Sequence, residues 1–261
     1  MTEFMNLYPK PRSFKFLGGS SALSPNLKLR AIGDEAQRLI ANVQVERRYP
    51  SAIKGGFSAK DASSAETAFE MEFLPDMHPQ GYVLEWSNDR LKVGARTEIG
   101  LHYALVTLEQ LVSREGTTLG HFRIEDEPSF PVRGVMLDIG RNKIPKMDTL
   151  YALIDRLSEL KFNHLQLYME GFCFDYVKYR SSFPEATPLS AAEFRELDAY
   201  ARSRYIDLVP NQNCLGHMGP WLAKPEFREL AEHPDGMEPP IPLPFKLPPT
   251  TMNPADERSV A

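Results

Sequence analysis

The second half of the chain alternates short apolar runs with longer helical patterns, and this alternation limits the possible folds more than any other feature. The runs are GVMLDIGR, starting at residue 134, FNHLQLYME, starting at residue 162, and IDLVPNQN, starting at residue 206. Between them lie two segments whose apolar residues recur at helical spacing. Because strand–helix–strand units join parallel strands through right-handed crossovers, the pattern predicts a parallel β-α-β-α-β sheet.

Both helical segments carry a signal for a helix start and one apolar face. Asp148 can cap the first helix, and Ser190 with Glu193 forms a capping box at the start of the second. The residues expected to face a core are Leu150, Leu153, Ile154, Leu157 and Leu160 in the first helix and Phe194, Leu197 and Tyr200 in the second. GVMLDIGR is mostly apolar, which predicts a strand that is buried on both faces.

Residues 1–126 read as a small α+β domain, followed by the α/β domain at 127–261 after the proline-containing linker EDEPSFPVRG. SFKFLGG predicts a strand that ends in a turn, TAFEMEFLP predicts another strand, and GYVLEWSNDRLKVGA predicts a hairpin. Helices are expected over 25–43, with a face of Leu29, Ile32, Ala36 and Ile40, and after the cap Thr97, with a stripe of Leu101, Leu105, Leu108 and Leu111. The tail, GMEPPIPLPFKLPPTTMNP, predicts a proline-rich loop ordered against the rest of the protein.

The composition excludes several classes of partner. A net charge of -5, without a basic stretch, argues against nucleic acid, and no apolar run approaches the roughly 20 residues of a membrane helix. The first residues contain no apolar signal core, so a cytoplasmic location is expected. Cys173 and Cys214 predict free thiols rather than a disulfide framework. The histidines are scattered and no phosphate-binding loop follows a strand, so neither a metal nor a cofactor is predicted.

Polar side chains gather where the three predicted strands end. These side chains are Asp138 and Arg141 after the first strand, Tyr168 and Glu170 after the second, and Asn211, Asn213 and His217 after the third. In parallel α/β folds, ligands bind at the carboxyl ends of strands, so the three groups predict one polar binding site. Phe172, Phe174 and Tyr176 are suited to the apolar face of a sugar ring.

Each of these residues also has an ordinary structural interpretation. Asp138 could form a structural salt bridge with Arg133 or Arg141, and Arg141 could be a surface charge. Glu170 could be a solvated strand terminus, and His217 could bond a loop carbonyl. The aromatic residues could all belong to the core.

Three segments in order, RGVMLDIGRNKIP, LYALIDRLSELKFNHLQLYME and ELDAYARSRYIDLVPNQNCLGH, resemble the opening of the catalytic barrel of glycoside hydrolase family 20. This is the family of β-N-acetylhexosaminidases and related exo-β-glucosaminidases. The segment GYVLEWSNDRLKVGARTEIGLHYALVTLEQL resembles the small α+β domain that precedes this barrel. The resemblance implies roughly the first three β-α units of a TIM-type (β/α)8 barrel. Because such a barrel needs about 250 residues, we expect a truncated barrel.

The resemblance also implies roles for four residues. Arg141 matches the arginine that holds sugar hydroxyls, and Asp138 matches the acid that orients this arginine. Glu170 lies where the family usually has an Asp pair, and His217 matches a histidine of the active-site hydrogen-bond network. The chain departs from the family pattern at Asn211 and Leu215, where a Glu and a Pro are common, and EGFCFD replaces the usual Asp-Asp.

The resemblance implies removal of a terminal N-acetylhexosamine or glucosamine, and family members hydrolyse N-acetylhexosaminides with the help of the substrate's own acetamido oxygen. In the family, the Asp-Glu pair that takes part in this reaction follows the fourth strand of the barrel. We therefore expect the pair beyond residue 261, and we predict no catalytic residue in this chain. Residues 33–35, 125–127 and 256–257 contain similar acidic pairs but do not follow a buried strand. We therefore expect a carbohydrate as partner, an inactive polypeptide and self-association through the open barrel edge. The alternatives are another barrel hydrolase, O-GlcNAcase-like or α-glucuronidase-like, and a non-catalytic carbohydrate-binding or assembly protein.

Overall fold

The computed structural model of the chain describes residues 7–23, 28–42, 68–141, 143–239, 241 and 244–259. The chain divides into two compact units. The first contains Met1–Pro131 with Glu159–Lys161, and the second contains Val132–Ser158 with Phe162–Ala261. No helix in the described ranges is long and apolar enough to cross a membrane.

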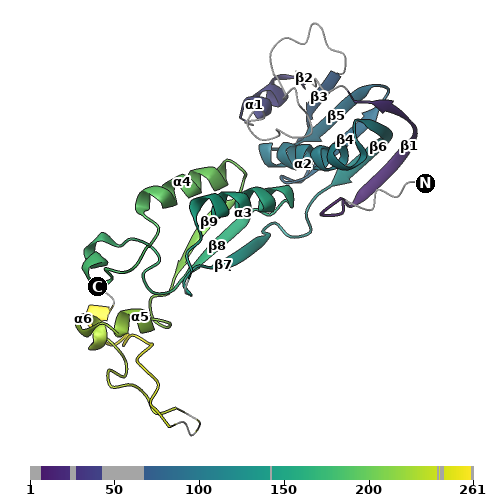
Figure 1. Cartoon of the computed structure of the whole chain (residues 1–261). Coiled ribbons are helices and arrows are strands. Elements are labelled where there is room, and N and C mark those ends of the chain that lie inside the picture. The colour runs from purple at the N-terminus through teal and green to yellow at the C-terminus, as the bar shows by residue number, and fades with distance from the viewer. Residues whose placement is uncertain are drawn as a thin grey trace. The chain divides into compact units, whose positions relative to one another are not determined.

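In its described residues, the first unit contains a six-stranded mixed sheet and two helices (Figure 1). The strands are β1 (Ser13–Ala22), β2 (Lys28–Ile32), β3 (Ala68–Phe73), β4 (Tyr82–Ser87), β5 (Arg90–Ala95) and β6 (Thr118–Asp126), and the helices are α1 (Asp34–Asn42) and α2 (Glu98–Glu115). Their order in the sheet is β1-β6-β4-β5-β3-β2, and only the β2–β3 and β3–β5 pairs are parallel. This arrangement is the small α+β architecture that the sequence predicts.

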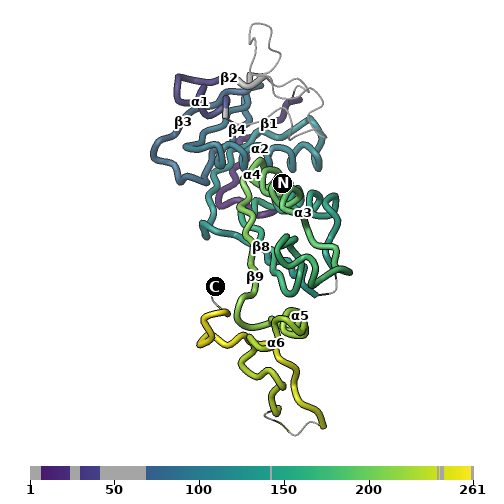
Figure 2. The backbone as a smooth tube through the Cα atoms, turned by 90° about the vertical axis from the view of Figure 1, so that its left-hand side faces the viewer, coloured from purple at the N-terminus to yellow at the C-terminus, as the bar shows by residue number. Residues whose placement is uncertain are grey.

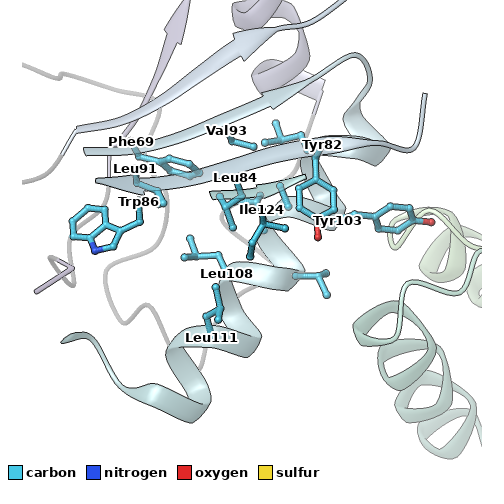
Figure 3. Packing of buried hydrophobic residues seen from close by; sticks show 14 of the residues in the cluster. Phe69, Tyr82, Leu84, Trp86, Leu91, Val93, Tyr103, Leu108, Leu111 and Ile124 are labelled. Atoms are coloured by element: carbon cyan, nitrogen blue, oxygen red, sulfur yellow. The ribbon is translucent and has the colours of Figure 1, made fainter. Parts of the chain in front are cut away.

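The core of the first unit lies between the sheet and α2. The four leucines of the predicted stripe are each at most 1% exposed, and Thr97 accepts a hydrogen bond from the Gly100 amide as the predicted cap. In Figure 3, Leu108 and Leu111 of the helix point toward Leu84 and Trp86 of the sheet. The periodicity of this helix therefore predicted its buried face correctly.

Two predictions for the first unit are wrong. Residues 28–32 are not part of a helix over 25–43, because they form β2 and pair in parallel with β3. Gly33, with φ of 86°, separates this strand from α1, which begins at Asp34. Ala36 and Ile40 of α1 are buried as predicted, whereas Ile32 is 48% exposed. The side chain of Leu29 lies outside the described residues. Strand pairing with a distant segment overrides the helical spacing of the apolar residues here.

The second error concerns β1 and its partner β6. SFKFLGG does not end in a turn, because Gly18 and Gly19, at φ of 80° and 77°, form an irregularity within a strand that continues to Ala22. Residues 118–126 form β6, which pairs with both β1 and β4, so Glu125 and Asp126 lie at the end of a strand rather than in a linker. The predicted hairpin is confirmed, with Asn88 and Asp89 at the positive φ angles of a two-residue turn.

The second unit contains the predicted parallel β-α-β-α-β arrangement. Its strands β7 (Gly134–Asp138), β8 (His164–Met169) and β9 (Asp207–Gln212) pair in parallel in that order. The crossover helices are α3 (Met147–Glu159) and α4 (Ala191–Arg202), and they lie over the same face of the sheet in Figure 1. Figure 2 shows the chain running from β9 into α5 (Gly219–Leu222) and α6 (Pro225–Arg228). The remaining short helices are η3 (Val177–Ser182) and η4 (Glu257–Ser259).

The helix-facing side of this sheet is well buried, while the other side is not. Leu165 and Leu167 of β8 are fully buried with residues of α3 and α4, whereas Met136 of β7 is 57% exposed. The prediction that GVMLDIGR is buried on both faces is therefore wrong for the described part of the unit. Within the described ranges, the crossover helices cover one face, and the opposite face carries Met136 in register with Gln166.

The two crossover helices largely follow the predicted faces. Ser190 and Glu193 form the predicted capping box, and Leu197 is fully buried. Asp148 does not cap α3, because the helix already includes Met147, and Asp148 lies in its first turn. Leu150, Ile154 and Leu157 are buried as predicted, but Leu160 lies beyond the end of α3 and is 37% exposed.

The tail folds back onto the loops that follow β9. Met237 pairs with Leu247 and Ala231 pairs with Met252 in isolated antiparallel bridges, and the Met252 amide donates to the Leu215 carbonyl. The end of the tail is therefore bound to the segment after β9, as predicted, whereas Met237 and Leu247 pair within the tail itself.

Candidate functional site

The carboxyl ends of β7, β8 and β9 form one row of polar side chains. Asp138 lies opposite Tyr168, and Tyr168 lies opposite Asn211. Arg141 follows three residues after Asp138, and Glu170 follows directly after β8. The parallel register therefore brings residues that are tens of positions apart in sequence to the same edge of the sheet.

The structure places all four predicted site residues in one cluster around the carboxylate of Glu170. Arg141 donates from Nη1 to Oδ2 of Asp138 at 3.0 Å and from Nη2 to Oε1 of Glu170 at 2.7 Å. His217 Nδ1 lies 3.1 Å from the same Glu170 oxygen. The Glu170 side chain is only 13% exposed, so this charge is stabilised by the groups that surround it.

Tyr168 is a further member of the cluster. Its hydroxyl donates to Glu170 Oε1 at 2.6 Å, and the Arg141 guanidinium lies 5.7 Å from its ring centre. Donation to the carboxylate raises the pKa of Tyr168, and a hydrogen bond with Asn213 acts in the opposite direction. The sequence placed Tyr168 at the strand end, but only the register shows that it shares an acceptor with Arg141 and His217.

The ordinary interpretations can now be compared with the contacts. Asp138 does pair with Arg141, but Arg141 also reaches Glu170 and keeps 57% of its side chain exposed. Glu170 is not a solvated terminus, and His217 contacts its carboxylate. Asn211 lies in the same row but is 4.0 Å from the sulfur of Met136, on the open side of the sheet. The site thus contains Asp138, Arg141, Tyr168, Glu170 and His217.

Two small residues hold the ends of β7 and β8 close together. A Cβ atom on Gly140 would lie 2.3 Å from the Glu170 amide nitrogen, so only glycine allows this approach. The thiol of Cys173 donates to the Glu170 carbonyl at 2.7 Å and lies 3.4 Å from the Ile139 carbonyl. Burial raises the pKa of Cys173 to about 11, so its thiol keeps the proton that it donates at neutral pH.

The aromatic residues after Glu170 belong to a packed cluster. Phe172 is 6% exposed and stacks on Phe183 with ring centres 4.7 Å apart. Phe174 contacts Phe194, and Tyr176 donates to Gln212. The core interpretation therefore holds for Phe172, and the other two rings are also engaged in packing or hydrogen bonding.

A cavity of about 310 Å³ is lined in part by rings of this aromatic cluster. Tyr179, Trp221, Phe227 and Met252 are among the residues of its apolar wall, and Asn213 provides part of the polar wall. None of the four predicted site residues lines it. Asn213 nevertheless links the two, because it hydrogen-bonds Tyr168 of the polar cluster and forms part of the cavity wall.

Comparison with known protein families agrees with the resemblance in the motifs. The family model described as glycosyl hydrolase family 20, domain 2, matches residues 5–127, and the model of the family's catalytic domain matches residues 130–238. Together these matches cover most of the chain, which belongs to glycoside hydrolase family 20.

Individual relatives are similar over most of this chain but are much longer. A β-hexosaminidase from Vibrio furnissii is 26% identical over 82% of the chain and 38% of its own length. The α subunit of β-hexosaminidase from Rattus norvegicus is 29% identical over 83% of the chain and 44% of its own length. The chain thus spans less than half the length of these relatives.

Solved structures share the fold at low sequence identity. An exo-β-N-acetylglucosaminidase from Vibrio harveyi matches 97% of the chain and 43% of its own, with a TM-score of 0.74 and 20% identity. An N-acetyl-β-hexosaminidase from Streptomyces plicatus matches 97% of the chain and 54% of its own, with a TM-score of 0.73 and 21% identity.

The close approach at Gly140 leads to a prediction about stability. Gly140→Ala should lower the free energy of unfolding by about 1–3 kcal/mol, because the new methyl group can only be accommodated by moving backbone. Chemical denaturation measures the change. Gly216→Ala is the matched control, since a Cβ atom there meets nothing within 4 Å. Equal stability of the two variants would contradict the tight contact between β7 and β8.

The two free cysteines should differ in reactivity. At about pH 8, iodoacetamide should modify exposed Cys214 and leave Cys173 unmodified, because a buried thiol with a pKa of about 11 forms little thiolate. Reactivity of Cys173 should appear only as the pH approaches its raised pKa or when denaturant is added. Peptide mass spectrometry measures both sites in one sample. Equal modification rates of the two cysteines at about pH 8 would show that the Cys173 thiol is accessible to the reagent and not protected by burial.

Proposed function

We propose that the chain provides the sugar-binding part of a glycosidase that removes terminal N-acetylhexosamine, or glucosamine, from glycans. The observation that carries the proposal is the exposed Arg141 guanidinium, which two carboxylates hold at the carboxyl ends of β7 and β8. The relatives named as β-hexosaminidases support the same class of substrate.

The contacts of Arg141 are suited to a sugar. A guanidinium has five N–H donors in a planar fork, and Asp138 and Glu170 each occupy one nitrogen, which orients the plane. The remaining donors can bond two neighbouring hydroxyls of a terminal sugar. Among the described residues, Glu170 Oε2 accepts no hydrogen bond, so it can accept from a hydroxyl while Oε1 keeps its three contacts.

For an N-acetylhexosamine substrate, the proposed reaction is retaining hydrolysis assisted by the substrate's acetamido group, as the family resemblance implies. It requires a carboxyl group that protonates the leaving oxygen and an aspartate that orients the acetamido group. Both carboxylates of the cluster accept hydrogen bonds from Arg141, so they orient the guanidinium and are not placed to act as this acid. We therefore propose that the 261-residue polypeptide binds the sugar without turnover.

The proposal includes the architecture around the site. The β-α-β-α-β order of the second unit and the catalytic-domain match support three strands of a (β/α)8 barrel. The uncovered sheet face with Met136 supports self-association of the polypeptide as given.

Sugar binding should depend on Arg141. Arg141→Ala should weaken binding of N-acetylglucosamine by at least about 30-fold, since loss of a charge-assisted pair of hydrogen bonds costs about 2–4 kcal/mol. Arg141→Lys should restore only part of the affinity, because one ammonium cannot reproduce the fork. Ligand-observed nuclear magnetic resonance measures the binding.

The matched control for this prediction is Arg202→Ala, which removes an exposed arginine from an ion pair with Asp198 on α4. Its binding should equal that of the unchanged protein. If Arg141→Ala lowers only the melting temperature and keeps the affinity, Arg141 is a structural partner of Asp138 and the sugar-binding role is wrong.

Turnover can be measured separately from binding. The polypeptide should release no chromophore from an aryl N-acetyl-β-glucosaminide above the rate of a blank, because no general acid lies in the cluster. Turnover at an enzymatic rate that one substitution in this chain abolishes would refute the assignment. Binding without turnover supports the proposal, and neither binding nor turnover favours an assembly role.

A further inference from the structure

The segment that carries His217 is attached to the turn that carries Glu170 at a second point. Directly after His217, the short helix α5 brings Pro220 and Trp221 against Gly171, the residue that follows Glu170. Trp221 Nε1 donates to the Gly171 carbonyl at 3.0 Å, and this hydrogen bond is buried.

The backbone conformation of Gly171 and its lack of a side chain allow this contact. Its φ is 60°, and a Cβ atom there would lie 3.2 Å and 3.3 Å from two side-chain carbons of Pro220. Pro220 and Trp221 therefore hold Gly171 from two sides, one by close packing and the other by a hydrogen bond. The residue after His217, Met218, is tied to Trp221 because the Trp221 amide donates to the Met218 carbonyl.

The indole of Trp221 has little freedom to move. It is 9% exposed, and the rings of Phe183, Phe227 and Tyr179 lie 4.8 Å, 5.6 Å and 5.6 Å from it, centre to centre. A donor that packing holds in one orientation fixes the position of its acceptor. The Gly171 carbonyl is therefore fixed relative to α5.

We infer that Trp221 is a positioning residue, which sets the contact between Glu170 Oε1 and His217 Nδ1 through its hydrogen bond to Gly171. Glu170 follows β8 and His217 follows β9. The hydrogen bond from Trp221 to Gly171 joins these two segments, since Gly171 is one residue after Glu170 and Trp221 is four residues after His217. The consequence for sugar binding rests on the proposed function, whereas the consequence for His217 does not.

The test uses Trp221→Phe in the full chain, because phenylalanine keeps an aromatic ring and loses the donor. At alkaline pH, where an ordinary imidazole is neutral, the ring ¹⁵N signals of His217 report which nitrogen carries the proton. In the unchanged protein we expect the Nδ1–H tautomer, since Nδ1 must donate to the carboxylate. Trp221→Phe should shift the population toward the Nε2–H tautomer and weaken N-acetylglucosamine binding by up to about tenfold.

Two further variants separate the hydrogen bond from packing. Phe227→Leu loosens the same aromatic cluster without removing the bond to Gly171, so it should lower the melting temperature and keep the tautomer. Gly171→Ala strains the held residue while Trp221 stays in place, so it should change the tautomer as Trp221→Phe does. Gly171→Ala also gives an answer if Trp221→Phe does not fold.

The outcomes distinguish this inference from the proposed function. An unchanged His217 tautomer in both Trp221→Phe and Gly171→Ala overturns the positioning role, as does an equal change in Phe227→Leu. If the tautomer responds as expected but the unchanged protein binds no N-acetylglucosamine, the positioning role stands and the proposed function fails.

Discussion

One carboxylate oxygen, Oε1 of Glu170, organises the second unit. It accepts contacts from the guanidinium of Arg141, the hydroxyl of Tyr168 and the imidazole of His217. A carboxylate that is 13% exposed is costly to bury unless polar groups replace its water, and these three groups do so. Because they come from three different strand ends, the parallel register of β7, β8 and β9 is a condition for the site.

The backbone around Glu170 is held from several directions. Gly140 allows β7 to approach within van der Waals contact, Cys173 bonds the Glu170 carbonyl, and Trp221 bonds the next carbonyl, that of Gly171. These contacts involve the backbone of Gly140, Glu170 and Gly171 rather than the Glu170 carboxylate. They explain why a run of aromatic residues and a cysteine directly follows Glu170: the run forms the support of the site.

The elements that the sequence predicted well are those whose signal is local. The stripe of leucines in α2, the capping box at Ser190 and the hairpin at Asn88 depend on residues within a few positions of each other. The errors occur where the secondary structure of a segment depends on a strand that is distant in sequence. Residues 28–32 have helical spacing but pair with β3, and residues 118–126 become a strand because β1 and β4 lie on either side.

The sequence by itself predicted the parallel strands and the polar residues at their ends, because both follow from periodicity and strand boundaries, and the family resemblance then singled out four of these residues. Only the tertiary structure decided that Glu170 is the shared acceptor, that Tyr168 joins it and that Trp221 holds Gly171. It also decided that Met136 is exposed, since α3 and α4 cover one face of the sheet in the described part of the unit. The physical reason is that these contacts join residues tens of positions apart in sequence. The distance between such residues depends on how the strands and helices pack, which local sequence patterns do not specify.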